Sequence, residues 1–132
     1  MPTFKLNKLV RDKLPAVYES IGQKAKLKLL SKDEHATALI DKIIEEAGEL
    51  RGPTITKEKF TNEIGDLQQA IDDLMELKDI TPEDVAKSQE AAKNEKGSFS
   101  QGAYIETLEL QAEDTWIAYY RAEPEKYPEL DQ

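Results

Sequence analysis

Residues 31–52, SKDEHATALIDKIIEEAGELRG, decide the fold of this chain, because they combine a helix start, a helical apolar stripe and a helix end. Ser31 followed by Glu34 is typical of a capping box, in which the hydroxyl and the carboxylate each accept a hydrogen bond from the other residue's backbone N–H group. A Gly-Pro pair predicts that the helix ends at about Arg51. Apolar side chains recur every three or four residues, which predicts one buried face comprising Ala36, Leu39, Ile40, Ile43, Ile44, Ala47 and Leu50.

Start and stop signals of the same kind predict three more helices. Alternation of apolar and polar residues with period two predicts two short strands that can pair. The expected helices span residues 12–21, 57–78 and 82–96, and the expected strands span residues 25–29 and 103–108. The sequence therefore predicts a mainly α protein, a helical bundle with a minor two-stranded β element.

Composition excludes several classes of protein. The chain has 132 residues, of which 39% are hydrophobic and 34% charged, which is typical of one soluble globular domain. Because cysteine is absent, a disulfide scaffold, a thiol nucleophile and a zinc–thiolate site are all excluded. No run of residues approaches the apolar length of a membrane helix, and the first residues lack the apolar stretch of a signal peptide. We therefore expect a cytoplasmic protein with no membrane partner.

Charge is unevenly distributed along the chain. The net charge is −9 at pH 7, which argues against a nucleic-acid partner. Residues 1–32 carry +6, from eight basic and two acidic side chains, whereas residues 33–132 carry −15. This pattern suits docking of the basic segment on the acidic body, or a polyphosphate held between basic side chains and carboxylate-bound metal. A solvated basic edge is the simpler alternative.

Acidic side chains lie along the apolar faces of the two long helices. Glu46 falls at the edge of the first stripe, and Glu49 lies one turn further along the same flank. Glu63 falls inside the stripe of the helix over residues 57–78, and Asp66 follows along its flank. The short connection predicts an antiparallel hairpin, in which these four carboxylates can converge.

A metal ion would explain this convergence, because four ionised carboxylates cannot share one site uncompensated. Oxygen ligands favour a hard divalent cation, Mg²⁺ or Mn²⁺, and Mg²⁺ readily bridges carboxylates to phosphate oxygens. A phosphorylated substrate is therefore indicated. Two alternatives remain open. In one, Glu46 and Glu49 lie on a solvated face of the helix. In the other, Glu63 forms an ion pair with Lys42.

Three motifs, in order along the chain, resemble those of a known superfamily. Residues 45–49, EEAGE, followed after thirteen residues by residues 63–66, EIGD, resemble the E-x-x-E … E-x-x-D signature of the MazG superfamily of all-α nucleoside triphosphate pyrophosphohydrolases. Residues 8–15, KLVRDKLP, are similar to the K-L-V-R-D-K-I-P opening of one MazG-like subgroup, and residues 93–99, KNEKGSF, to its K-x-x-R-G-G-F segment. The resemblance covers about residues 5–110.

The resemblance implies an activity, a cofactor and an assembly. The expected reaction is hydrolysis of a nucleoside triphosphate, standard or non-canonical, between the α and β phosphates, which gives a monophosphate and pyrophosphate. The expected cofactor is Mg²⁺, with Mn²⁺ as an alternative, and the expected assembly is a homo-oligomer, a dimer or a tetramer. By position, the catalytic and metal-binding residues are Glu46, Glu49, Glu63 and Asp66, and the substrate-binding residues are Arg11, Lys13, Lys93 and Lys96.

Departures from the family pattern keep other activities open. Lys96 stands where arginine is usual, which keeps the charge but loses the bidentate fork, and Ser98 replaces the second glycine. The Gly-Ser-Tyr-Thr opening typical of phosphoribosyl-ATP pyrophosphohydrolase is missing, so that activity is an alternative, as is a non-catalytic helical oligomerisation module. We expect a pyrophosphohydrolase domain over residues 1–110 and a partly loose, aromatic and acidic extension over residues 111–132, with Trp116, Tyr119 and Tyr120.

Overall fold

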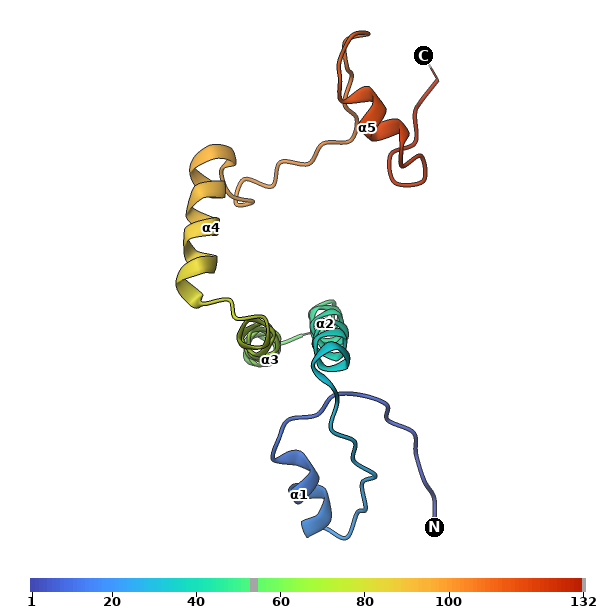
Figure 1. Cartoon of the computed structure of the whole chain (residues 1–132), viewed down its shortest axis with the longest axis vertical. Helices are drawn as coiled ribbons and strands as arrows, with labels where there is room; N and C mark the ends of the chain where they lie inside the picture. The colour runs from blue at the N-terminus through green and yellow to red at the C-terminus, as the bar shows by residue number, and fades with distance from the viewer. Residues whose placement is uncertain (53–54, 132) are drawn as a thin grey trace. The chain divides into compact units, whose positions relative to one another are not determined.

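The structure, a computed structural model, describes residues 1–52 and 55–131. Within these residues the chain is mainly helical, as the sequence predicts, and each expected helix is present. The helices are α1 (Leu14–Ser20), α2 (Lys32–Gly48), α3 (Lys57–Leu77), α4 (Pro82–Lys96) and α5 (Ile117–Arg121) (Figure 1).

Side-chain caps fix where the long helices begin. Ser31 Oγ accepts a hydrogen bond from Glu34 N at 3.3 Å, and Glu34 Oε1 accepts one from Ser31 N at 3.2 Å, which completes the capping box of α2. Thr56 Oγ1 caps α3 by accepting from Lys59 N at 3.2 Å. At the start of α4, Asp84 N donates to Thr81 Oγ1 at 3.1 Å. These interactions satisfy N–H groups that have no partner inside the helix.

The end of α2 differs from the prediction, because the helix stops at Gly48 and not near Arg51. Beyond it, tighter turns replace α-helical hydrogen bonds: Leu50 N donates to Ala47 O at 3.2 Å, and Arg51 N donates to Gly48 O at 3.1 Å. The predicted end at the Gly-Pro pair is therefore about three residues late.

The predicted two-stranded β element is wrong for the described residues, which contain no strand. Residues 25–29 and 103–108 are irregular. Their apolar side chains are open to solvent, and Leu29 is 88% and Tyr104 88% exposed. A strand is stable only when its backbone pairs and one of its faces is covered. Alternation over so few residues supplies neither.

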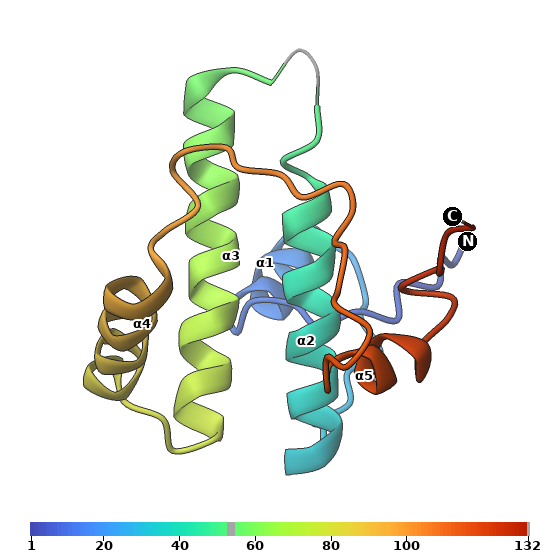
Figure 2. The ribbon, with the colours of Figure 1, turned by 90° about the horizontal axis from the view of Figure 1, so that it is seen from above.

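Helices α2 and α3 form the central packing unit of the chain. They lie side by side and run antiparallel, joined by the short connection that follows α2 (Figure 2). Leu39 of α2 is 2% exposed and forms a small core with Ala36 and Ala70. The predicted buried face of α2 is wrong in part, because Ile40 is 47% and Ile44 65% exposed: one partner helix covers only part of the apolar stripe. Glu46 is also buried. The contact face of the hairpin therefore carries a charged group among small apolar side chains.

Contacts divide the chain into two compact units, Met1–Asn94 and Glu95–Gln132. The second unit has its own aromatic cluster, in which the ring centroids of Trp116 and Tyr119 are 5.3 Å apart and those of Tyr120 and Tyr127 are 5.0 Å apart. Such edge-to-face pairs stabilise a small unit. The domain boundary expected after residue 110 stays a prediction.

No helix in the described part of the chain has both the length and the apolar character that crossing a bilayer requires.

Candidate metal centre

Three carboxylates converge between α2 and α3. One oxygen from each of Glu46, Glu63 and Asp66 lies within 4.8 Å of the other two. Glu63 and Asp66 are three residues apart on α3, so that they lie one turn apart on the same face. Antiparallel packing then brings Glu46 of α2 opposite them. The structure thus brings together three of the four carboxylates expected from the sequence.

Glu46 is the most constrained member of this group. It is 9% exposed, and the nearest cation, Lys42 Nζ, lies 3.6 Å from its Oε1. Burial raises the pKa of Glu46 above its ordinary value, and a hydrogen bond with the Glu63 carboxyl raises it further. The attraction of Lys42 opposes these effects. The buried carboxylate is therefore only partly compensated by the protein's own charges.

This raised pKa predicts how the stability of the metal-free chain depends on pH. When the pKa of a carboxyl is higher in the folded state, its contribution to the free energy of unfolding is greatest below the ordinary pKa of 4.5. This contribution is lost as pH rises through the raised pKa of the folded state. We therefore expect Glu46→Gln to gain free energy of unfolding, relative to wild type, as pH rises across this interval. Urea unfolding in EDTA between pH 4 and 7.5 measures the difference. Parallel curves for the two proteins would contradict the prediction.

Arg11 joins the N-terminal segment, residues 1–13, to this centre. Its Nη2 donates a hydrogen bond to Asp66 Oδ1 at 2.6 Å, across 55 positions of sequence. Both side chains remain open to solvent, with 63% of Arg11 and 43% of Asp66 exposed. The N-terminal segment and α1 lie on one side of the α2–α3 pair (Figure 1). Arg11, which the resemblance assigns to substrate binding, is therefore hydrogen-bonded directly to a carboxylate of the cluster.

The other site residues predicted from sequence lie outside the three-carboxylate group. Glu49 follows the last residue of α2, is exposed, and lines an open hollow with Arg51 and Lys59. Lys13 is the exposed residue that precedes α1. Lys93 and Lys96 are exposed on the last turn of α4, on the two sides of the boundary between the units.

Lys42 has a different partner from the one considered in the sequence. Its Nζ lies 3.3 Å from Glu45 Oε2 and 3.6 Å from Glu46 Oε1. No ion pair with Glu63 is present among the described side chains. The spacing of three and four residues along α2 was the available signal for both contacts. The alternative in which Lys42 neutralises Glu63 is therefore not what the structure shows.

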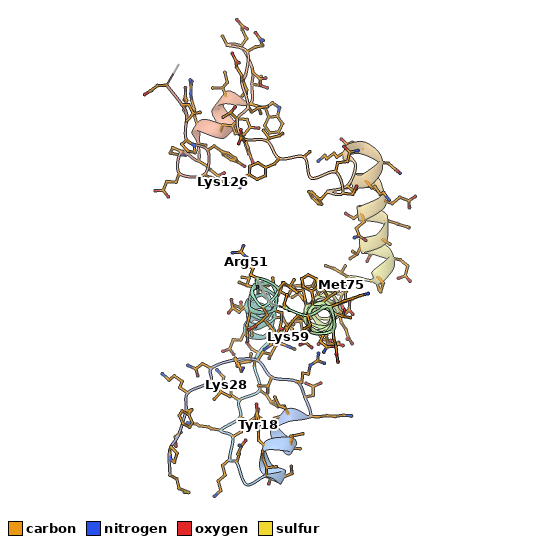
Figure 3. All side chains as sticks on the ribbon, turned by 180° about the vertical axis from the view of Figure 1, so that it is seen from behind. Tyr18, Lys28, Arg51, Lys59, Met75 and Lys126 are labelled. Atoms are coloured by element: carbon orange, nitrogen blue, oxygen red, sulfur yellow. The ribbon has the colours of Figure 1, made fainter. Side chains whose placement is uncertain are left out.

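The donor set of the cluster fits a hard metal ion. All three donors are carboxylate oxygens, which are typical ligands of Mg²⁺, Mn²⁺ and Ca²⁺. The chain has no cysteine, and its one histidine, His35, is near the opposite end of α2 from Glu46. Figure 3 draws the side chains of the described residues and labels Met75 on α3 and Lys28 on the irregular segment that leads into α2. The group can therefore hold a metal ion.

Comparison with protein-family models, with curated proteins and with solved structures finds no match to this chain. The resemblance to the MazG superfamily therefore depends on the motifs themselves.

Proposed function

We propose that this chain is a metal-dependent nucleoside triphosphate pyrophosphohydrolase, which cleaves between the α and β phosphates and releases a monophosphate and pyrophosphate. One observation carries the proposal: Glu46, Glu63 and Asp66, three of the four acidic positions of the family signature, converge within 4.8 Å. Carboxylates on separate helices that meet at a partly buried point suit a divalent cation and a phosphorylated substrate.

Each acidic residue has a role in this proposal. Glu46, Glu63 and Asp66 would hold Mg²⁺, for which Mn²⁺ can substitute. When bound, the ion would offset the charge of the triphosphate and lower the pKa of a coordinated water. Glu49 lies outside the group and is open to solvent, which leaves its carboxylate available to orient the attacking water and accept its proton.

Basic residues would neutralise the phosphate oxygens. Arg11 lies at the carboxylate group, and Lys13 follows two residues later in the same basic segment. A guanidinium suits this role because it can donate two parallel hydrogen bonds to phosphate. The resemblance assigns the same role to Lys93 and Lys96, and this stays a prediction.

We also propose that the chain assembles as a homo-oligomer through the hairpin. Apolar side chains remain exposed along the flanks of α2 and α3, with Ile44 65% and Ile64 43% exposed. Ile44 follows Ile43, and Ile64 follows Glu63, and both preceding residues are half-buried. One position along a helix is a turn of about 100°, and in an antiparallel pair this turn leads to the same side from both helices. A second copy of this hairpin would cover that face and complete a four-helix arrangement.

Pyrophosphate release tests the proposed activity. The full chain is incubated with a panel of standard and modified nucleoside triphosphates in Mg²⁺, in Mn²⁺ and in EDTA. We expect pyrophosphate and monophosphate in equal amounts with either metal, and a fall to the uncatalysed rate in EDTA. Release of single phosphate would contradict cleavage between the α and β phosphates.

Two other outcomes would favour the alternatives. Activity on phosphoribosyl-ATP alone would identify a specialised pyrophosphohydrolase. A folded chain that binds metal ions weakly and acts on no nucleotide would favour a non-catalytic helical oligomerisation module, in which the carboxylates form ion pairs between subunits.

A further inference from the structure

We propose that Arg11 and a divalent cation compete for Asp66. In the metal-free chain, Arg11 serves as the counter-ion of this carboxylate. Cation binding releases the guanidinium, which then becomes available to an anionic ligand such as a triphosphate. This inference depends on the proposed function, and it adds an exchange of partners that links the metal centre to the N-terminal segment.

A single charged contact ties the N-terminal segment to the hairpin. Among the described residues, the bond from Arg11 Nη2 to Asp66 Oδ1, at 2.6 Å, is the only hydrogen bond or ion pair that joins residues 1–13 to α2 or α3. Loss of this contact would therefore release the segment from the carboxylate group without breaking any other polar interaction of those residues.

Electrostatics favours exchange over simultaneous binding. Three carboxylates within 4.8 Å repel one another, and one guanidinium offsets part of that charge. A divalent cation offsets twice as much and bonds directly to the oxygens. Once Asp66 ligates such an ion, Arg11 faces both a weakened acceptor and a repelling positive charge. The two cations therefore oppose each other at this carboxylate.

The contact is also easy to break. Arg11 is 63% and Asp66 43% exposed, and ion pairs open to solvent contribute little to stability. Residues 1–13 include no helix or strand, and the backbone hydrogen bonds of Arg11 O and Lys13 O run to α1 and not to the hairpin, so that the segment can leave the hairpin together with α1. In contrast, Lys42 lies beside Glu46 because the two residues are one turn apart on the same helix.

The opposite role for Arg11 makes a different prediction. A positioning residue would hold Asp66 through Oδ1 while Oδ2 faces the ion, and its removal would weaken metal binding. A competing residue would do the reverse, and its removal would strengthen metal binding. The direction of the change in affinity therefore decides between the two roles.

Mn²⁺ binding to the full chain, measured by electron paramagnetic resonance without nucleotide, tests the inference. We expect Arg11→Gln to lower the Kd for Mn²⁺ by about three- to tenfold. Arg11→Lys keeps the positive charge and should stay closer to wild type. The matched control is Lys24→Gln, which removes one charge from the same basic region at an exposed position and should leave the Kd nearly unchanged.

Hydrogen exchange provides a readout that is independent of affinity. Saturating Mn²⁺ should increase hydrogen exchange of the Leu14 and Val17 amides, which donate to Arg11 O and Lys13 O, in wild type, and Arg11→Gln should show this faster hydrogen exchange without metal. An unchanged or higher Kd in Arg11→Gln, or slower hydrogen exchange next to Arg11 with metal, would overturn the proposed competition for Asp66. Either result would leave the metal centre intact. Absence of Mn²⁺ binding in every variant would overturn both.

Discussion

Glu63→Gln is expected to lower metal-dependent pyrophosphate release about 10³-fold or more, while the chain remains folded. Glutamine keeps the shape of the side chain but removes the charge through which Glu63 would hold the cation. The substitution also removes the repulsion between the Glu63 carboxylate and those of Glu46 and Asp66, whose oxygens lie within 4.8 Å of it. We therefore expect thermal stability in EDTA to be unchanged or slightly higher. Initial rates at saturating Mg²⁺ and thermal unfolding in EDTA measure the two effects.

The matched control for this variant is Glu76→Gln. It makes the same change of charge on the same helix, but Glu76 is exposed and outside the carboxylate group. Turnover of this control should stay within about twofold of wild type. Full metal-dependent turnover in Glu63→Gln would show that the assignment of the centre is wrong. Loss of turnover in both variants would point to a general effect of charge.

Leu39→Ala is expected to destabilise the chain by about 2–4 kcal/mol, because it leaves a cavity that the small neighbouring side chains cannot fill. Leu39 is 2% exposed, and the other buried apolar residues of the described chain, Ala36 and Ala70, are both small. Leu39 is therefore the only large apolar side chain among the buried residues of the described chain. Urea unfolding followed by circular dichroism measures the change.

Ile44→Ala provides the comparison on the same helix. Ile44 is 65% exposed, so that its truncation should have little effect on the isolated chain. Its effect should appear only at protein concentrations where copies associate, because the proposed assembly covers this side chain. The effect of Leu39→Ala should be similar at all concentrations. Equal destabilisation by both substitutions in dilute protein would contradict the packing of the hairpin.

The helices themselves could be predicted from local sequence. The cap residues Ser31, Thr56 and Thr81 act on backbone groups within three residues, so that no distant contact is needed to place them. Helical periodicity likewise identified Leu39 as buried and placed Glu46 and Glu63 on facing stripes. The expected strands at residues 25–29 and 103–108 failed because a strand depends on a distant partner, which alternation alone cannot specify.

The composition of the carboxylate group was decided by tertiary structure. The sequence suggested four acidic residues at helical spacing, but which of them meet depends on how α2 packs on α3. Glu49 keeps a helical backbone at the C-cap of α2, yet it is exposed and outside the group. The contact between Arg11 and Asp66 spans 55 positions, and no local pattern encodes it. Caps and periodicity act over a few residues and can be read along the chain, whereas partners at the centre are selected by packing in three dimensions.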